Sequence, residues 1–288
     1  MKDAIFVVGM GRSGSSALTR VLSLCGAALP RRVLAANSAN PTGYWEPERV
    51  VALNERFLHA HGSSWFDASL RLQHCAPGGE PRARFVREAA VLLEEAFEDG
   101  GPLVVKDPRI SGLLPYWTAA AEQLGLRPAF VHVFRNPDDV VASLVERDAL
   151  PEVQAYALWL KYNVIAERDT RAFARVFVSY EDLLDDWERV VRRSIGELRV
   201  PLAIDAAARG AVGRFLSPAM CHHASGRGPS RGGGAVVNRT YELLKAARRV
   251  RPDGAAFDAM LARYPRVPAD ALRAPAWSVP SGAIAESP

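Results

Sequence analysis

The chain has 288 residues, enough for one large domain or two small ones, and its 49% content of hydrophobic residues is ample for a buried core. The formal net charge is only +4, from 36 basic and 32 acidic residues, which favours anionic ligands mildly and argues against nucleic-acid binding. No apolar run approaches the roughly 20 residues that span a bilayer, no signal peptide is recognised, and the three cysteines lack metal-like spacing. We therefore expect a cytoplasmic protein with no membrane partner.

The first ordered stretch predicts a binding site for phosphate groups. An apolar segment over residues 4–8 enters a glycine-rich turn, and an apolar-periodic segment over 18–24 then indicates a helix. Backbone N–H groups of such a turn converge on one point, where the helix dipole adds positive potential. The residues predicted to bind the phosphate groups are Gly11, Arg12, Ser13, Gly14, Ser15 and Ser16.

This turn differs from that of ordinary nucleotide triphosphatases. Gly9 and Gly14 occupy the glycine positions of G-x-x-x-x-G-K-[ST], but Ser15 stands in the place of the lysine. Arg12 is the one cation inside the loop. The alternative interpretation is a plain strand–turn–helix unit whose glycines allow tight packing.

Strand and helix patterns alternate along most of the chain. Strands are predicted at 103–105, 129–134 and 176–178, and helices at 46–61, 82–97, 113–124, 138–147, 152–172 and 238–250. This alternation predicts an α/β fold, a doubly wound and mostly parallel sheet with helices on both faces. We expect one domain over residues 1–250 and an irregular, proline-containing tail over 251–288.

Polar clusters follow three of the predicted strands, at 9–16, 106–109 and 135–143. Because ligands bind at the carboxyl ends of parallel strands, these clusters should meet. Arg135 offers a planar bidentate fork for a phosphate, and Ser143, about two helical turns later, can support it. The alternative is an ion pair of Arg135 with Asp138 or Asp139.

Taken together, these residues resemble a known family. Gly-Met-Gly-Arg-Ser-Gly-Ser-Ser at 9–16 is similar to the 5′-phosphosulfate loop of sulfotransferases that use 3′-phosphoadenosine 5′-phosphosulfate (PAPS). Arg135-Asn136-Pro137 followed by Ser143 resembles their 3′-phosphate site, and the 178–183 segment resembles the one whose tyrosine, here Tyr180, lies near the adenine. The matches fall in the family's order over residues 4–185.

The resemblance implies transfer of a sulfuryl group from PAPS to a hydroxyl, or less readily an amine, of a small-molecule acceptor, with no metal required. The composition, rich in alanine and arginine, suggests a bacterial enzyme of specialised metabolism. Two other interpretations stay open: a P-loop small-molecule kinase that uses magnesium and ATP, and a nucleotide-binding module without catalysis.

Catalytic roles follow from the chemistry of sulfuryl transfer. The bridging oxygen that leaves gains negative charge, and we assign its stabilisation to Arg12 and Lys106. One branch of the family places a basic histidine two residues after this lysine, where this chain has Pro108. Other branches of the family use a glutamate soon after the first helix, so the resemblance implies Glu46 as the general base, with Glu48 second and Asp107 third. An ion pair between Lys106 and Asp107 is the alternative for the lysine.

The acceptor pocket is expected from residues 37–75 and 145–165, with Tyr44, Trp45 and Asp107 as candidate substrate contacts. The two aromatic residues suit an acceptor pocket, stacking on the adenine or a core position equally well. The Gly/Arg-rich stretch over 222–236 is a possible lid whose arginines, Arg227 and Arg231, reach the 3′-phosphate; a disordered loop is its alternative.

Overall fold

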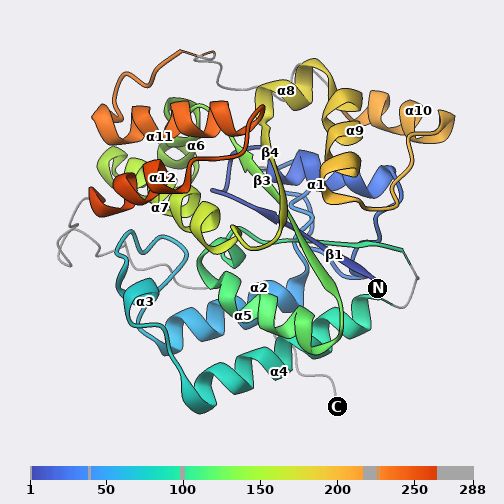
Figure 1. Ribbon diagram of the computed structural model, residues 1–288, viewed down its shortest axis with the longest axis horizontal. Coiled ribbons are helices and arrows are strands. Elements are labelled where there is room, and N and C mark those ends of the chain that lie inside the picture. The colour runs from blue at the N-terminus through green and yellow to red at the C-terminus, as the bar shows by residue number, and fades with distance from the viewer. Residues whose placement is uncertain (1, 38–39, 98–100, 217–225, 227, 265–288) are drawn as a thin grey trace.

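A computed structural model describes residues 2–37, 40–97, 101–216, 226 and 228–264 (Figure 1). Its centre is a single parallel sheet with the strand order β2-β1-β3-β4. The strands are β1 (Asp3–Val8), β2 (Leu103–Lys106), β3 (Arg127–Phe134) and β4 (Ala174–Ser179). The prediction of an α/β fold with helices on both faces of a parallel sheet is confirmed.

The order of the strands reverses beside β1. The chain passes from β1 to β2 on one side and then to β3 on the other, and Val7 is in register with both Lys106 and Val131. The carboxyl ends of these three strands therefore lie level with one another. Because ligands of open parallel sheets bind where the strand order reverses, the fold places a binding site above the ends of β1 and β3.

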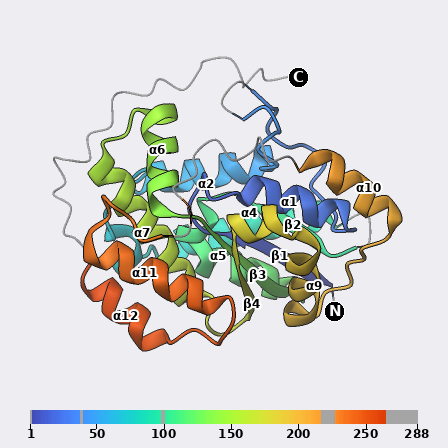
Figure 2. The same ribbon diagram turned by 90° about the horizontal axis from the view of Figure 1, so that it is seen from above.

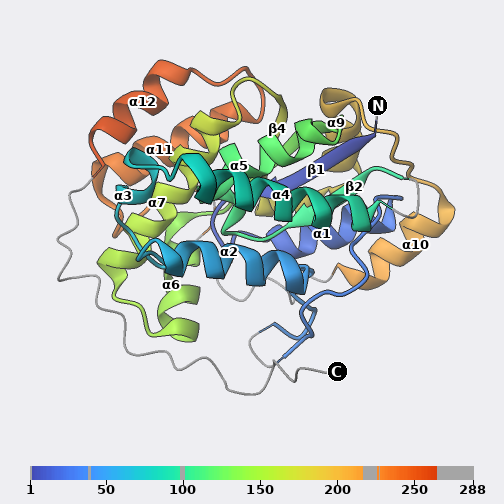
Figure 3. The same cartoon turned by 90° about the horizontal axis from the view of Figure 1, so that it is seen from below.

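Alternating side chains of β1 face two separate layers of helices. Phe6 and its neighbours on one face pack against α2 (Glu48–Ala60), α4 (Gly79–Ala96) and α5 (Ile110–Gln123), which lie together in the view from below (Figure 3). Ile5 and Val7 on the other face pack with α1 (Ser15–Leu24), α9 (Trp187–Leu198) and α10 (Ala206–Phe215). All six residues of β1 are buried, as expected for a strand covered on both faces.

A third group of helices gathers away from α10, as the view from above shows (Figure 2). It consists of α6 (Pro137–Asp148), α7 (Glu152–Asp169), α11 (Gly234–Ala247) and α12 (Gly254–Ala262). Trp159 of α7 and Tyr241 of α11 meet with ring centres 6.3 Å apart inside this group. Two short helices, α3 (Arg71–His74) and α8 (Tyr180–Asp185), complete the described elements.

The prediction of an irregular tail is wrong at residues 254–262. Asp253 accepts hydrogen bonds from the amides of Ala255 and Ala256, which starts α12, and Phe257 and Met260 bury themselves against the rest of the protein. Its short, alanine-rich sequence carries little amphipathic pattern, so the helix depends on this packing. Residues 265–288 lie outside the described part of the chain.

Several predicted boundaries shift by a few residues. The helix expected from residue 46 begins at Glu48, because Pro47 keeps an extended backbone at its N-cap. The helix expected over 238–250 spans Gly234–Ala247, and α3, α9 and α10 were not predicted. Across the ranges that the structure describes, no helix combines the length and apolar character needed to cross a membrane.

Candidate active site

The loop between β1 and α1 turns through three residues with positive φ: Gly9 at 121°, Arg12 at 67° and Gly14 at 86°. A Cβ at Gly9 would lie 2.1 Å from the carbonyl oxygen of Val133, and one at Gly14 would lie 2.1 Å from the ring of Tyr180. Both positions therefore require glycine. Arg12 adopts this region as a non-glycine residue, a strain of about 1–3 kcal/mol that is common at functional sites.

Two serines complete the loop. The amide of Gly9 donates to the Ser111 hydroxyl at 2.9 Å, and that hydroxyl lies 3.2 Å from the Gly9 carbonyl oxygen, to which it donates. Ser111 on α5 thus fastens the start of the loop. The Ser13 hydroxyl is buried and has no hydrogen-bond partner among the described residues. Because a buried hydroxyl without a partner is costly, Ser13 suits a bound anion.

A hydrogen bond joins the loop to the cluster after β3. Arg12 Nε donates to the Ser143 hydroxyl at 2.7 Å. Burial lowers the pKa of Arg12, and the charge of Arg147 lowers it further. Residues predicted to bind the two ends of the donor therefore lie in direct contact.

Arg135 and Tyr180 form the other side of this region. The Arg135 guanidinium carbon lies 5.0 Å from the centre of the Tyr180 ring, and Nε lies 3.3 Å from a carboxylate oxygen of Asp139. The ion pair that we considered as an alternative role for Arg135 is thus present, with Asp139 and not with Asp138 as partner. The fold brings Arg12, Gly14, Ser143, Arg135 and Tyr180 together, as predicted.

Lys106 and Glu46 form a buried ion pair beside the loop. Lys106 Nζ lies 2.5 Å from Glu46 Oε1, and it also donates to the Ser16 hydroxyl at 3.1 Å and the Tyr44 carbonyl oxygen at 3.2 Å. The side chains of the pair are 3% and 8% exposed. Lys106 therefore pairs with Glu46 and not with Asp107, and Glu48, on the first turn of α2, is exposed.

Arg109 holds the other side of Glu46. Its Nη1 lies 3.7 Å from Glu46 Oε2 and 2.8 Å from Asp107 Oδ1, and its Nε pairs with Glu55. Burial alone would lower the pKa of Arg109, but Asp107, Glu55 and Glu46 together raise it above its ordinary value. Arg109 is therefore a permanent cation, and the sequence had given it no role of its own.

Asp107, a candidate acceptor contact, lies away from the protein surface. Its side chain is fully buried, with Oδ2 accepting from Asn54 at 2.8 Å and Oδ1 accepting from Arg109. Asn54 is held in turn by the Trp117 indole at 3.0 Å. Asn54 and Glu55 were missed; the only available signal was a polar pair inside the apolar stripe of the helix after Glu46.

Tyr44 and Trp45 lie next to this pair and are partly exposed. The Tyr44 hydroxyl donates to Asn37 at 2.9 Å, and the Trp45 ring lies under the Arg20 guanidinium at 4.5 Å. They are therefore not core residues, and the acceptor and adenine interpretations of these rings remain predictions.

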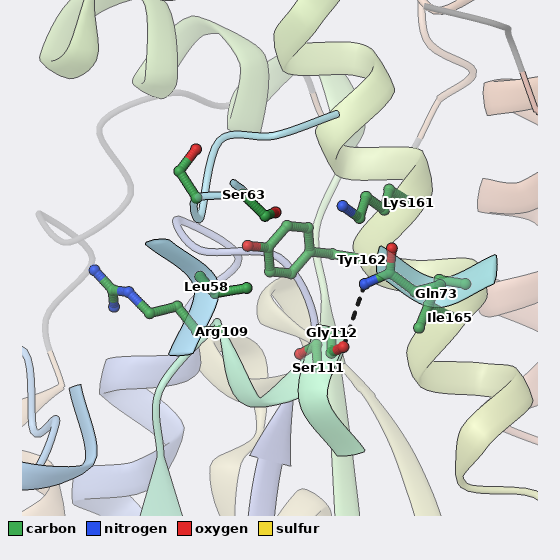
Figure 4. Close-up of a pocket in the computed structure, with 10 residues that line it drawn as sticks. Leu58, Ser63, Gln73, Arg109, Ser111, Gly112, Lys161, Tyr162 and Ile165 are labelled. Atoms are coloured by element: carbon green, nitrogen blue, oxygen red, sulfur yellow. Dashed lines mark hydrogen bonds between the residues drawn. The ribbon is translucent and has the colours of Figure 1, made fainter. Parts of the chain in front are cut away.

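A small polar pocket lies beside Arg109 (Figure 4). It is lined mainly by residues 58–73 and 161–165, within the ranges predicted for the acceptor pocket. Lys161 donates to the carbonyl oxygens of Asp67 and Ser69 at 2.7 Å each, and burial lowers the pKa of Lys161 to about 8. The volume, about 10 Å³, matches one water molecule, so this pocket is too small to hold an acceptor.

The described part of the predicted lid rests on the start of α6. Asn136 donates to the carbonyl oxygens of Gly226 and Gly228, at 2.9 and 3.2 Å. Asp138 accepts from the amide of Arg231 at 2.9 Å. The segment thus lies beside the Arg135 cluster, with the Arg231 side chain exposed. Arg227 lies outside the described residues.

The sequence matches a known protein family. The profile of the sulfotransferase family matches residues 4–203. Similar solved structures include the sulfotransferase domain of the Synechococcus PCC 7002 olefin synthase, with 17% identity, a TM-score of 0.47 and coverage of 93% of this chain and 96% of that one. The sulfotransferase domain from the curacin biosynthetic pathway has 17% identity, a TM-score of 0.45 and 93% coverage of each chain.

The sulfotransferase STF1 of Mycobacterium tuberculosis H37Rv is 16% identical, with a TM-score of 0.39 and coverage of 86% of this chain and 77% of that one. No curated protein is detectably similar in sequence. Over the described residues, no group of three His, Cys, Asp or Glu side chains is arranged to hold a metal ion. Because the family profile matches well over half of the 288 residues, the chain belongs to the sulfotransferase family.

Proposed function

We propose that this sulfotransferase uses PAPS as donor and transfers its sulfuryl group to a hydroxyl, or less readily an amine, of a small-molecule acceptor. The observation that carries the proposal is the contact of Arg12 with Ser143, which unites two anion-binding clusters from neighbouring strands. PAPS bears anionic groups at both the 5′ and the 3′ position of its adenosine and so needs two such clusters. ATP has no use for the second.

In this proposal the amides of residues 11–16 and the Ser13 hydroxyl bind the 5′-phosphosulfate, as helix N-termini bind phosphates. Arg135 and Ser143 bind the 3′-phosphate, joined by Arg231 and Arg227 of the lid. Tyr180, whose ring touches Gly14, lies against the adenine.

The transfer is an in-line displacement with a loose transition state. The acceptor oxygen forms a bond to sulfur while the bond from sulfur to the bridging oxygen breaks, and adenosine 3′,5′-bisphosphate leaves. Arg12 and Lys106 stabilise the charge on the bridging oxygen, a contribution of about 3 kcal/mol for each such contact. As Lys106 moves toward that oxygen it releases Glu46, which takes the proton of the acceptor hydroxyl.

Arg109 keeps Glu46 in place during this exchange. It contacts Glu46 from the side opposite Lys106 and is itself held by Glu55 and Asp107. The carboxylate therefore keeps a cationic neighbour and an orientation after Lys106 has left it.

Thermal unfolding with adenosine 3′,5′-bisphosphate, compared with ATP plus magnesium, tests the donor site. A ligand at about 100 times its Kd adds roughly 2.7 kcal/mol of stability. We expect a shift with the bisphosphate alone and, with labelled PAPS and a panel of hydroxyl compounds, transfer of label. A shift only with magnesium and ATP would replace the proposal by a kinase, and bisphosphate binding without transfer to any acceptor would leave a nucleotide-binding module.

A further inference from the structure

A second basic pocket lies on the outer side of β4, the last strand of the sheet, away from the loop that follows β1. Its walls come from the segment that enters β4, from β4 itself and from the chain between α11 and α12, which passes beside β4 (Figure 1). The volume is about 380 Å³, within the range of small-molecule sites. Five arginines line it: Arg171, Arg175, Arg248, Arg249 and Arg251.

Buried or partly buried carboxylates hold three of these arginines in place. Arg171 and Arg175 both pair with Glu167, whose side chain is fully buried, at 2.6 and 3.1 Å. Arg171 also pairs with Asp258 of α12 at 2.8 Å. Arg248 pairs with Asp182 at 2.5 Å. These guanidinium groups are therefore fixed before any ligand arrives, which lowers the entropic cost of binding.

Arg193 of α9 joins the two sides of the pocket. It donates to the carbonyl oxygen of Phe177 on β4 and, at 2.8 Å, to that of Arg248 at the end of α11. Its carboxylate neighbour is Glu197, 3.5 Å away, the one acidic residue among the lining residues that the structure describes. Hydrogen bonds of Arg193 therefore fix β4 and the end of α11 relative to each other at this pocket.

The positive charges outnumber the negative ones. The cations are Arg193 and the five lining arginines, whereas four carboxylates pair with them, those of Glu167, Asp182, Glu197 and Asp258. The excess comes from Arg249 and Arg251, which are exposed and have no ion-pair partner within the described ranges. Burial lowers the pKa of Arg175, Glu167 opposes this shift, and the charges of Arg171 and Arg251 lower the pKa further. An anion would relieve this crowding of like charges.

The geometry indicates which kind of anion fits. Two aromatic residues, Phe173 and Phe177, are part of the lining, and the Arg175 guanidinium lies 5.4 Å from the centre of the Phe177 ring. Guanidinium forks bind phosphoryl oxygens two at a time, unlike the point charge of an ammonium group, and the described lining contains no lysine. A concave pocket with several forks suits a compact, multiply charged phosphate group.

We propose that this pocket binds a polyphosphate group, either free or as the phosphate chain of a nucleotide, with Arg249 and Arg251 closing over it. The site is separate from the proposed donor site, because none of the donor-site residues lines this pocket. It is independent of the identity of the sulfuryl donor.

The test is calorimetric titration of the full chain with pyrophosphate. The key variant is Arg249→Ala with Arg251→Ala, since both side chains are exposed and their loss leaves the core unchanged. The matched control is Arg239→Ala with Arg263→Ala, which removes two exposed arginines elsewhere and so lowers the net charge equally. Pyrophosphate bound by the phosphate loop contributes equally to all three proteins.

We expect the wild type and the control to bind one more pyrophosphate per chain than the Arg249/Arg251 variant. If all three proteins bind the same number, the variant should bind at least about tenfold more weakly, which corresponds to 1.4 kcal/mol. Equal stoichiometry and affinity in all three proteins would overturn the proposal. ATP that displaces pyrophosphate from this site would identify a nucleotide as the natural occupant, whereas retention of pyrophosphate in excess ATP would identify a free polyphosphate.

Discussion

Lys106 Nζ and Glu46 Oε1 lie 2.5 Å apart in a buried ion pair beside the loop between β1 and α1. We assign charge stabilisation to Lys106 and proton removal to Glu46. Each of these groups is therefore engaged by the other in the ion pair. The pair has to separate before either group acts, and an anionic donor that attracts Lys106 would separate it. Under the proposed roles, donor binding and exposure of Glu46 are linked through this one contact.

Replacing Glu46 tests its assignment as the general base. Glu46→Gln keeps the shape and loses the proton acceptor, so we expect kcat to fall by about 10²–10⁴-fold. Binding of adenosine 3′,5′-bisphosphate should persist, as measured by titration calorimetry. The control is Glu48→Gln, exposed two residues away, and a larger loss of kcat there than at Glu46 would contradict the assignment.

Arg109 should matter for both stability and catalysis. Arg109→Met leaves Asp107 and Glu55 without their shared cation. Because breaking a buried ion pair is costly, we expect the free energy of unfolding, measured with urea, to fall by about 3–5 kcal/mol. Arg109→Lys keeps the charge without the fork, so we expect a stable protein whose kcat falls by about 10²-fold because Glu46 is misplaced. Arg56→Met is the control, since its pair with Glu88 is exposed and worth about 0–1 kcal/mol. Full activity of Arg109→Lys would show that its fork does not position Glu46.

Arg135 should recognise the 3′-phosphate. Arg135→Ala removes charged hydrogen bonds worth about 1.5–3 kcal/mol, which corresponds to a loss of roughly 10–150-fold in affinity for adenosine 3′,5′-bisphosphate. Adenosine 5′-phosphate lacks the 3′-phosphate, so its affinity should hardly change. An equal loss for both nucleotides would assign Arg135 to the support of the loop instead.

The contact between Gly14 and Tyr180 predicts an unusually severe glycine substitution. Gly14→Ala places a Cβ 2.1 Å from the Tyr180 ring at a φ of 86°, whereas Gly26, at 104°, has no atom within 4 Å of such a Cβ. Gly26→Ala should cost only the backbone strain, about 1–2 kcal/mol. Gly14→Ala should cost about 1–3 kcal/mol more and abolish nucleotide binding. Similar losses of unfolding free energy in the two variants would contradict the close approach of Tyr180.

His132 predicts a loss of stability in weak acid. It is fully buried, with Nε2 donating to Asn163 at 2.9 Å, and burial lowers its pKa to about 4. Below its ordinary pKa of about 6.5 the unfolded chain binds a proton that the folded chain refuses, so stability falls from pH 6.5 toward pH 4. Between pH 6.5 and 5 the loss should reach about 2 kcal/mol.

The variant that tests this role is His132→Gln, because glutamine does not titrate. Its free energy of unfolding should fall less than that of the wild type between pH 7 and 5. His74→Gln, at an exposed position, should behave as the wild type does. Denaturant unfolding at the two pH values measures both differences. The same pH slope in His132→Gln and the wild type would mean that His132 does not control acid stability.

Short stretches of sequence predict the alternation of buried strands and helices, the glycine-rich turn after β1 and the placement of Arg135 and Ser143 in one polar cluster. Such features depend on residues a few positions apart, on glycines that permit positive φ and on helical spacing, so they are predictable without a fold. The place of His132 inside an apolar strand likewise indicates a core position, and the structure buries it fully.

Only the tertiary structure decided which charges meet. The pairing of Lys106 with Glu46, the contact of Asp107 with Asn54 and the pairing of Arg109 with Glu55 join residues about 50–60 positions apart through the order of the strands. Helix α12 exists because Phe257 and Met260 find a surface to cover, which no local pattern encodes. Electrostatic partners depend on distance in space, and a chain of 288 residues offers many charges at each separation in sequence.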